Sequence, residues 1–211
     1  MTNTLRATLK WASSGGWLGE TRVQWERYPD DNAVRTAYLW VLAPLVHREG
    51  TSFQVGYSVA AQGADESRFV LNQPSQQVPP GDPAYVLDGH YSPYYTPSAL
   101  LVQSVIAATS VRLSQTVNIR LNGAYGVVAH EDAPFFSVAS GAAQPTVERG
   151  FVRRRFTPRE MRLTVGVDLS PGLRLIANGQ TGATAYYHYT TAGAQLSYRI
   201  AAAAHRRLAR H

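Results

Sequence analysis

Apolar and polar residues alternate with a period of two along nine stretches of this chain. In the first stretch, Leu5, Ala7, Leu9 and Trp11 are separated by polar or basic residues. A period of two puts successive side chains on opposite faces of a β-strand, so each stretch predicts a strand with one apolar and one polar face. The predicted strands are residues 4–11, 17–26, 33–47, 52–59, 100–113, 116–127, 160–169, 173–182 and 192–200.

Two features depart from this alternation. Residues 38–42 in the third predicted strand are apolar on both sides, which is typical of a strand buried on both faces or of a short helix. Residues 63–98 and 130–157 have no periodicity and are interrupted by proline and glycine, so they are predicted as long loops.

The connections between the predicted strands run short, medium, short, long, short, long, short and medium, so every second one is tight. In a meander, this order places every tight turn at the same end of the sheet, as in bacterial outer-membrane barrels with short periplasmic turns and longer external loops. We therefore expect an all-β fold, an antiparallel up-and-down transmembrane β-barrel with about nine visible strands. The alternative is a soluble β-barrel or sandwich that binds a ligand, with its apolar faces turned inward.

The strand number suggests that the barrel is larger than this chain. A complete single-chain bacterial barrel has an even number of strands, so nine strands predict either the C-terminal part of a larger barrel or a count that is wrong by one. Residues 1–200 are expected to form the β-barrel region, and residues 201–211 a basic C-terminal tail. The start of the chain does not resemble an export signal, which a missing N-terminal part would explain.

Composition narrows the class of protein. Among 211 residues, 45% are hydrophobic and 16% are charged, against roughly 25% charged in an average soluble domain. The net charge of +6 comes from dispersed arginines without a recognition motif, which argues against nucleic-acid binding. No apolar run reaches the roughly 20 residues of a membrane helix. The chain has no cysteine, and its histidines lack metal-site spacing, so no metal and no cofactor is expected.

Two segments carry a family resemblance. They are the aromatic-Ser-Pro segment at residues 89–97 and the alternating segment at residues 192–200. Together they resemble the C-terminal barrels of bacterial exopolysaccharide-export proteins of the cellulose synthase outer-membrane subunit type. The resemblance implies an outer-membrane pore for a polysaccharide chain in a Gram-negative-type bacterium, in contact with outer-membrane lipid and lipopolysaccharide. It also implies a periplasmic scaffold of helical repeats upstream. Outer-membrane barrels commonly end on an aromatic residue, whereas this strand reaches Ile200 and continues into the basic tail.

The candidate functional residues are basic and aromatic. If the polar faces line a lumen, a set of cations points into it and favours anionic solutes or an acidic polymer, unless internal salt bridges neutralise them. This set is Arg6, Lys10, Arg22, Arg112, Arg120, Arg162, Arg174 and Arg199. Tyr91, Tyr94 and Tyr95 in the first long loop are candidates for stacking on sugar rings, with anchoring at the membrane interface as the alternative.

Two further segments suggest weaker hypotheses. Residues 153–155 are three arginines, which suit lipopolysaccharide phosphates or an ordinary solvated loop. His130 and Glu131 suggest a barrel enzyme, but the chain has no Gly-x-Ser-x-Gly motif. We therefore expect a pore or an anchor that performs no catalysis.

Overall fold

The computed structural model describes the chain except for residues 73–83, 88, 140–145, 186 and 200–211. The fold is all-β and antiparallel, with 77% of residues in strands and no helix in the described part. The predicted fold class is confirmed at this level. The predicted basic tail lies outside the described residues.

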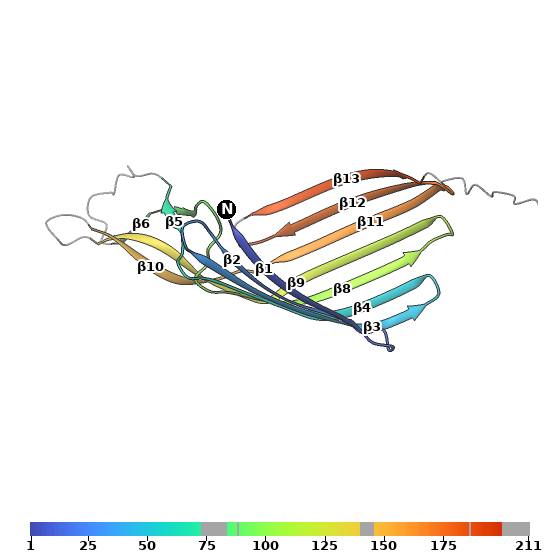
Figure 1. Ribbon diagram of the computed structural model, residues 1–211, viewed down its shortest axis with the longest axis horizontal. Coiled ribbons are helices and arrows are strands. Elements are labelled where there is room, and N and C mark those ends of the chain that lie inside the picture. The colour runs from blue at the N-terminus through green and yellow to red at the C-terminus, as the bar shows by residue number, and fades with distance from the viewer. Residues whose placement is uncertain (73–83, 88, 140–145, 186, 200–211) are drawn as a thin grey trace, which may run out of the picture.

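One large sheet contains nine strands in a continuous path (Figure 1). Their order is β1 (Asn3–Ala12), β2 (Leu18–Arg27), β3 (Ala33–Arg48), β4 (Thr51–Ala64), β8 (Leu100–Arg112), β9 (Val117–Ala139), β11 (Arg159–Ser170), β12 (Leu173–Ala183) and β13 (His188–Tyr198). These strands correspond to the nine predicted from the alternation. Each one pairs with the next along the chain, apart from the segments inserted after β4 and β9.

The β1–β2, β3–β4, β8–β9 and β11–β12 turns lie together at one end of the sheet, at the right of Figure 1. Two of them require a left-handed backbone, and glycine supplies it at Gly16 (φ 81°) and Gly50 (φ 73°). We call this the turn end, and the opposite end the loop end. The two long connections, β4–β8 and β9–β11, leave from the loop end as predicted, but the β2–β3 and β12–β13 connections there (residues 28–32 and 184–187) are as short as the turns at residues 13–17 and 113–116.

The two predicted loops contain strands, so that part of the prediction is wrong. After β4, β5 (Phe69–Leu71) and β7 (Gly89–Tyr91) form a separate two-stranded sheet, and β6 (Ala84–Leu87) pairs with β9. After residue 127, β9 continues to Ala139 and pairs with β10 (Thr146–Arg155) as an extension beyond the main sheet. Pro134 is tolerated in β9 because, among the described residues, the strand has a neighbour there only on its β10 side.

The described sheet does not close into a barrel. β1 and β13 are its two edges, and no pairing joins them in the described part of the chain. The sheet is nevertheless curved: Tyr38 on β3 and Glu160 on β11 line one hollow, and Glu20, Ser58 and Ser104 on their face are buried, whereas Leu5 and Leu9 on the other face are exposed. One face is therefore concave and the other convex.

Candidate passage along the concave face

The register of the ladders places the apolar side of each strand next to the apolar side of its neighbour. From β1, Leu9 pairs with Thr21, Thr21 with Leu39, and Leu39 with Val59. Because directly paired residues point to the same side, these residues belong to one face, which carries the apolar set of every strand. The hollow lined by Tyr38 and Glu160 lies on the opposite, polar face. The apolar face is thus convex and the polar face concave.

The convex face is exposed although it is apolar. Leu5 is 70% exposed, Leu9 66%, Leu196 62% and Leu163 42%. On the concave face, by contrast, Glu20, Ser58 and Ser104 are buried. This is the reverse of a soluble sandwich, where the apolar faces of two sheets pack together and exclude water. In the described residues, no second layer covers the convex face.

The predicted cationic residues share the concave face. Arg6 pairs with Gln24, Lys10 with Glu20, and Arg22 with Tyr38, and Arg112, Arg120, Arg162 and Arg174 fall in the same rows of the ladder further along the sheet. Arg199 follows β13, where its backbone N–H donates to the Gly172 carbonyl, and it lines a polar hollow of about 590 Å³ with Arg174. The structure therefore brings these residues to one side, and their role in a lumen stays a prediction.

Several of these cations are paired with acids. Glu20 is buried and lies 2.5 Å from the Arg22 guanidinium and 3.6 Å from the Lys10 ammonium. Arg174 lies 3.6 Å from Asp168, with both side chains about half exposed. The alternative of internal salt bridges thus accounts for part of the set.

Arg112 and Arg120, like Arg199, differ from the cations that are paired with acids. They occupy diagonal positions on β8 and β9, since Arg112 pairs with Asn118 and Arg120 with Ser110. Within the part of the chain that the structure describes, neither guanidinium has an ion-pair or hydrogen-bond partner. The turn end of the concave face therefore keeps an excess of positive charge.

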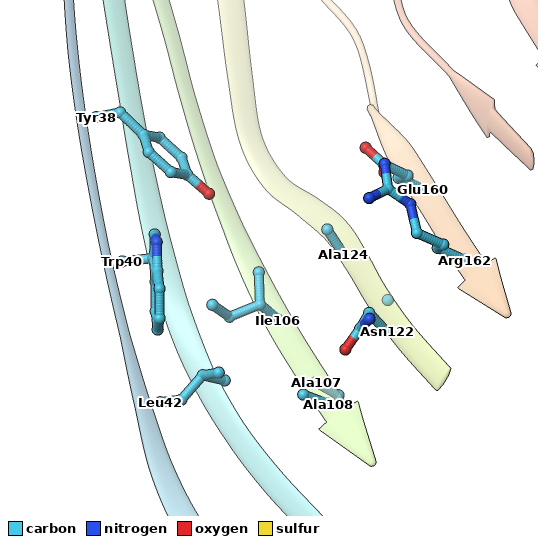
Figure 2. A pocket seen from close by; sticks show the side chains of 11 residues that line it. Tyr38, Trp40, Leu42, Ile106, Ala107, Ala108, Asn122, Ala124, Glu160 and Arg162 are labelled. Atoms are coloured by element: carbon cyan, nitrogen blue, oxygen red, sulfur yellow. The ribbon is translucent and has the colours of Figure 1, made fainter. Parts of the chain in front are cut away.

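A hollow of about 270 Å³ lies in the middle of the concave face. Figure 2 shows Tyr38 and Trp40 on β3, the Glu160 and Arg162 pair on β11, and Ile106 and Asn122 between them. Arg162 also donates to Gln180 at 2.9 Å, and Gln180 donates to Glu160 at 3.0 Å. Two aromatic rings thus face a fixed set of carboxylate, amide and guanidinium groups.

Sequence reasoning missed this hollow. The apolar run at residues 38–42 is the available signal, and its pattern predicts a strand buried on both faces or a short helix. In the structure Tyr38, Trp40 and Leu42 instead project from the polar face, while Leu39 and Val41 belong to the convex side. Nothing in the sequence indicated that β11, more than a hundred residues later, would complete the hollow.

The predicted loop tyrosines are engaged within the protein. Tyr94 stacks on Tyr28 at 3.6 Å between ring centroids and donates to Asp30 at 2.8 Å. The Tyr94 hydroxyl and the nearby Arg68 guanidinium hold the pKa of Asp30 below its ordinary value. Tyr91 donates to Glu131 at 2.7 Å and meets the Tyr95 ring edge to face at 4.9 Å. These contacts fix the segment before β8 onto the loop end.

The enzyme hypothesis gains no support from His130 and Glu131. They are consecutive in β9, so their side chains point to opposite faces. Glu131 is fully buried. In the neighbouring extension, Arg153 pairs with Asp132 at 3.0 Å and lowers the pKa of that carboxyl. In the described residues, no group of three or more His, Asp or Glu side chains is placed to hold a metal ion.

Comparisons with known proteins leave the family open. No protein-family model matches this chain, and no curated protein matches it. Among the described residues, no helix has the length and apolar character needed to span a membrane. The resemblance to exopolysaccharide-export barrels therefore stays a prediction.

Glu20 is the carboxylate on which the concave face near β1 depends. Replacing it by glutamine (Glu20→Gln) removes both ion pairs while keeping the side-chain shape, so we expect the free energy of unfolding to fall by about 2 kcal/mol. This value is smaller than for a fully buried ion pair because the Lys10 and Arg22 side chains are partly exposed to solvent. Asp168→Asn, in an exposed pair, is the matched control and should change it by less than about 0.5 kcal/mol. Guanidinium denaturation followed by tryptophan fluorescence measures both. Equal effects of the two variants would contradict this assignment.

Proposed function

We propose that this chain forms part of the wall of an outer-membrane β-barrel, with lipid against the convex face and a polar passage along the concave face. The observation that carries the proposal is the exposure of a continuous apolar face over nine strands, with Leu5 70%, Leu9 66% and Leu196 62% exposed. Large apolar patches on a soluble surface are an aggregation hazard, whereas lipid requires such a face.

Aromatic residues border the convex face at two heights. Trp11, Phe53 and Tyr198 lie toward the turn end, and Trp25 and Tyr125 lie toward the loop end. Aromatic girdles of this kind mark the two membrane interfaces of transmembrane barrels. From Val117 to Tyr125, β9 rises roughly 26 Å, or about 20 Å if tilted by 40°, which is close to the apolar band of such barrels.

The order of the connections supports one orientation. Both long segments, β4–β8 and β9–β11, lie at one end, and every connection at the other end is short. In outer-membrane barrels the tight turns are periplasmic and the long segments external. In this orientation β10 lies at the external end, where its guanidinium groups beyond those held by Ser67 and Asp132 are candidates to pair with lipopolysaccharide phosphates.

The concave face suits a polysaccharide chain. Tyr38 and Trp40 offer ring faces on which the apolar side of a sugar ring packs, and Glu160, Arg162 and Asn122 offer hydrogen bonds to its hydroxyls. The excess of positive charge from Arg112 and Arg120 near the turn end favours a polymer with acidic groups. In this proposal the chain positions a polymer and performs no covalent chemistry. The upstream periplasmic scaffold implied by the family resemblance is part of the same proposal.

A soluble ligand-binding barrel or sandwich would need the opposite arrangement. Its apolar residues would pack in an interior, whereas Leu9, Val23, Leu121 and Leu196 are at least 36% exposed here. We therefore favour the membrane function.

The two faces are distinguished by cysteine accessibility, because the chain has no native cysteine. In the native membrane, Thr8→Cys and Asn178→Cys on the concave face should react with a membrane-impermeant maleimide. Their chain neighbours Leu9→Cys and Ala177→Cys, on the convex face, should react with this reagent at least tenfold more slowly, since water is absent from the hydrocarbon region. A lipid-soluble maleimide should label them. All four side chains are exposed in the structure, so a difference in labelling reports on the environment of each face rather than on burial within the protein. Equal labelling of both faces, or recovery of the protein in the soluble fraction, would contradict the proposal.

The sugar-binding part has its own test. A neutral glucose hexasaccharide should protect Asn122→Cys from the same water-soluble maleimide, because this residue lines the hollow. Adding Trp40→Ala should raise the concentration needed for half-protection about tenfold, consistent with roughly 1.4 kcal/mol of lost ring stacking. Trp25→Ala, on the convex face, is the matched control and should leave protection unchanged. Protection that does not depend on Trp40 would remove the hollow from the proposal.

A further inference from the structure

The two edges of the large sheet are long and unprotected. All ten residues of β1 are exposed, and so are all residues of β13 except Tyr189. Neither strand contains proline, and no register shift interrupts the ladder next to either one. An edge strand of this kind leaves about half of its backbone N–H and C=O groups pointing outward without a partner, which makes it a template for another strand.

The relative direction of β1 and β13 determines which strands can pair with these two edges. From β1 to β13 the path crosses eight pairings, and each of them is antiparallel. Eight reversals return the chain to its starting direction, so β1 and β13 run the same way. Joining these two edges directly would give a parallel pair in an otherwise antiparallel sheet.

Pairing with further copies of this chain does not give a closed antiparallel sheet either. In a ring of copies around a common axis, β1 of one copy meets β13 of the next, and this pair is again parallel. A two-fold pairing of β1 with β1 is antiparallel but places the tight turns of one copy beside the long loops of the other. This last exclusion rests on the proposed function, because a membrane barrel keeps its tight turns on one side.

We propose that β1 and β13 are docking edges for an odd number of antiparallel strands, at minimum one, contributed by a partner polypeptide segment outside these 211 residues. An odd number is required because each added strand reverses direction once. The convex positions of the docked strand are apolar, in continuity with Leu5 and Leu9 on one side and Ala194 and Leu196 on the other.

The concave positions of the docked strand next to β1 are acidic. Arg6 and Lys10 point to this side of β1, and the Lys10 side chain is 73% exposed. Across β2, Arg22 adds a third cation and Glu26, opposite Thr4, adds a second acid, while Glu20 is already shared between Lys10 and Arg22, so the cations outnumber the acids by three to two. Opposite charges on neighbouring strands stabilise a pairing, and like charges oppose it. The corresponding residues of β13 are uncharged (Thr191, Gly193, Gln195 and Ser197), so the choice of partner is made at β1.

The test uses the whole 211-residue chain in detergent micelles and a synthetic strand as the probe. The peptide has ten residues, with leucine at every second position and glutamate and threonine alternating between the leucines. We expect it to slow amide hydrogen exchange in residues 3–12 at least tenfold. A peptide with lysine in place of glutamate, and one with the same composition but no alternation, should give little protection. Failure of the acidic peptide to protect β1 would overturn the proposal.

Charge reversal on β1 provides the matched control. In the double variant Arg6→Glu and Lys10→Glu, the preference should invert, with the lysine peptide now protecting residues 3–12 better than the glutamate peptide. The comparison is made within one variant, so it does not depend on whether the substitutions weaken the fold. An unchanged preference would show that the β1 cations do not select the partner.

Introduced cysteines in the native membrane test the two alternatives, in which β1 pairs with β13 of the same chain or with a second copy. A disulfide within one chain between Ala7→Cys and Ala194→Cys would show that β1 and β13 pair directly, and a dimer linked through Ala7→Cys alone would show pairing with a second copy. Either result would overturn the proposal, and we expect neither. These outcomes are separable from those of the proposed function, because the peptide assay reports on the edge whether or not the convex face meets lipid.

Discussion

The backbone ladder between neighbouring strands sets the polarity of both faces of this protein. A side-chain period of two means that a slip by one residue at any pairing would move all later strands to the wrong face. Eight pairings in sequence keep Leu5, Leu39, Val105 and Leu196 on one side and Arg6, Ser104 and Gln195 on the other. Where the register does shift, as at Gln103/Ser104, the ladder resumes with the same faces on β8 and β9.

This separation creates both the exposed apolar surface and the concave polar surface. An unpaired backbone group in hydrocarbon costs on the order of several kcal/mol, so a strand that meets lipid must have its hydrogen bonds made by its neighbours. The seven interior strands of the path satisfy this condition wherever a neighbour pairs on each side, which excludes β3 beyond Leu42 and β9 at Pro134, and the two edges do not satisfy it. Meanwhile the concave side holds its charges by local pairing, as with Glu20 between Lys10 and Arg22. The site and the open edges are therefore consequences of the same sheet.

The sequence predicted the parts of this fold that depend on local pattern. All nine principal strands, their antiparallel order and the shared face of Arg6, Arg22, Arg120 and Arg162 follow from alternation and tight turns. The extension of β9 through Pro134 was missed, because a proline and acidic residues hide the alternation and the pairing with β10 supplies the missing support. The described sheet does not close, because β1 and β13 are not paired with each other, and no local pattern specifies the partner of an edge strand.

The central claim is that lipid touches the convex face and water the concave one, and the four tryptophans of the chain allow a direct measurement. Two variants are made in which only Trp25, on the convex face, or only Trp40, on the concave face, is retained and the others are phenylalanine. In bilayers with brominated acyl chains, Trp25 fluorescence should be strongly quenched, and Trp40 fluorescence should instead be quenched by aqueous iodide. Quenching of Trp40 by the brominated chains with no effect on Trp25 would contradict the account.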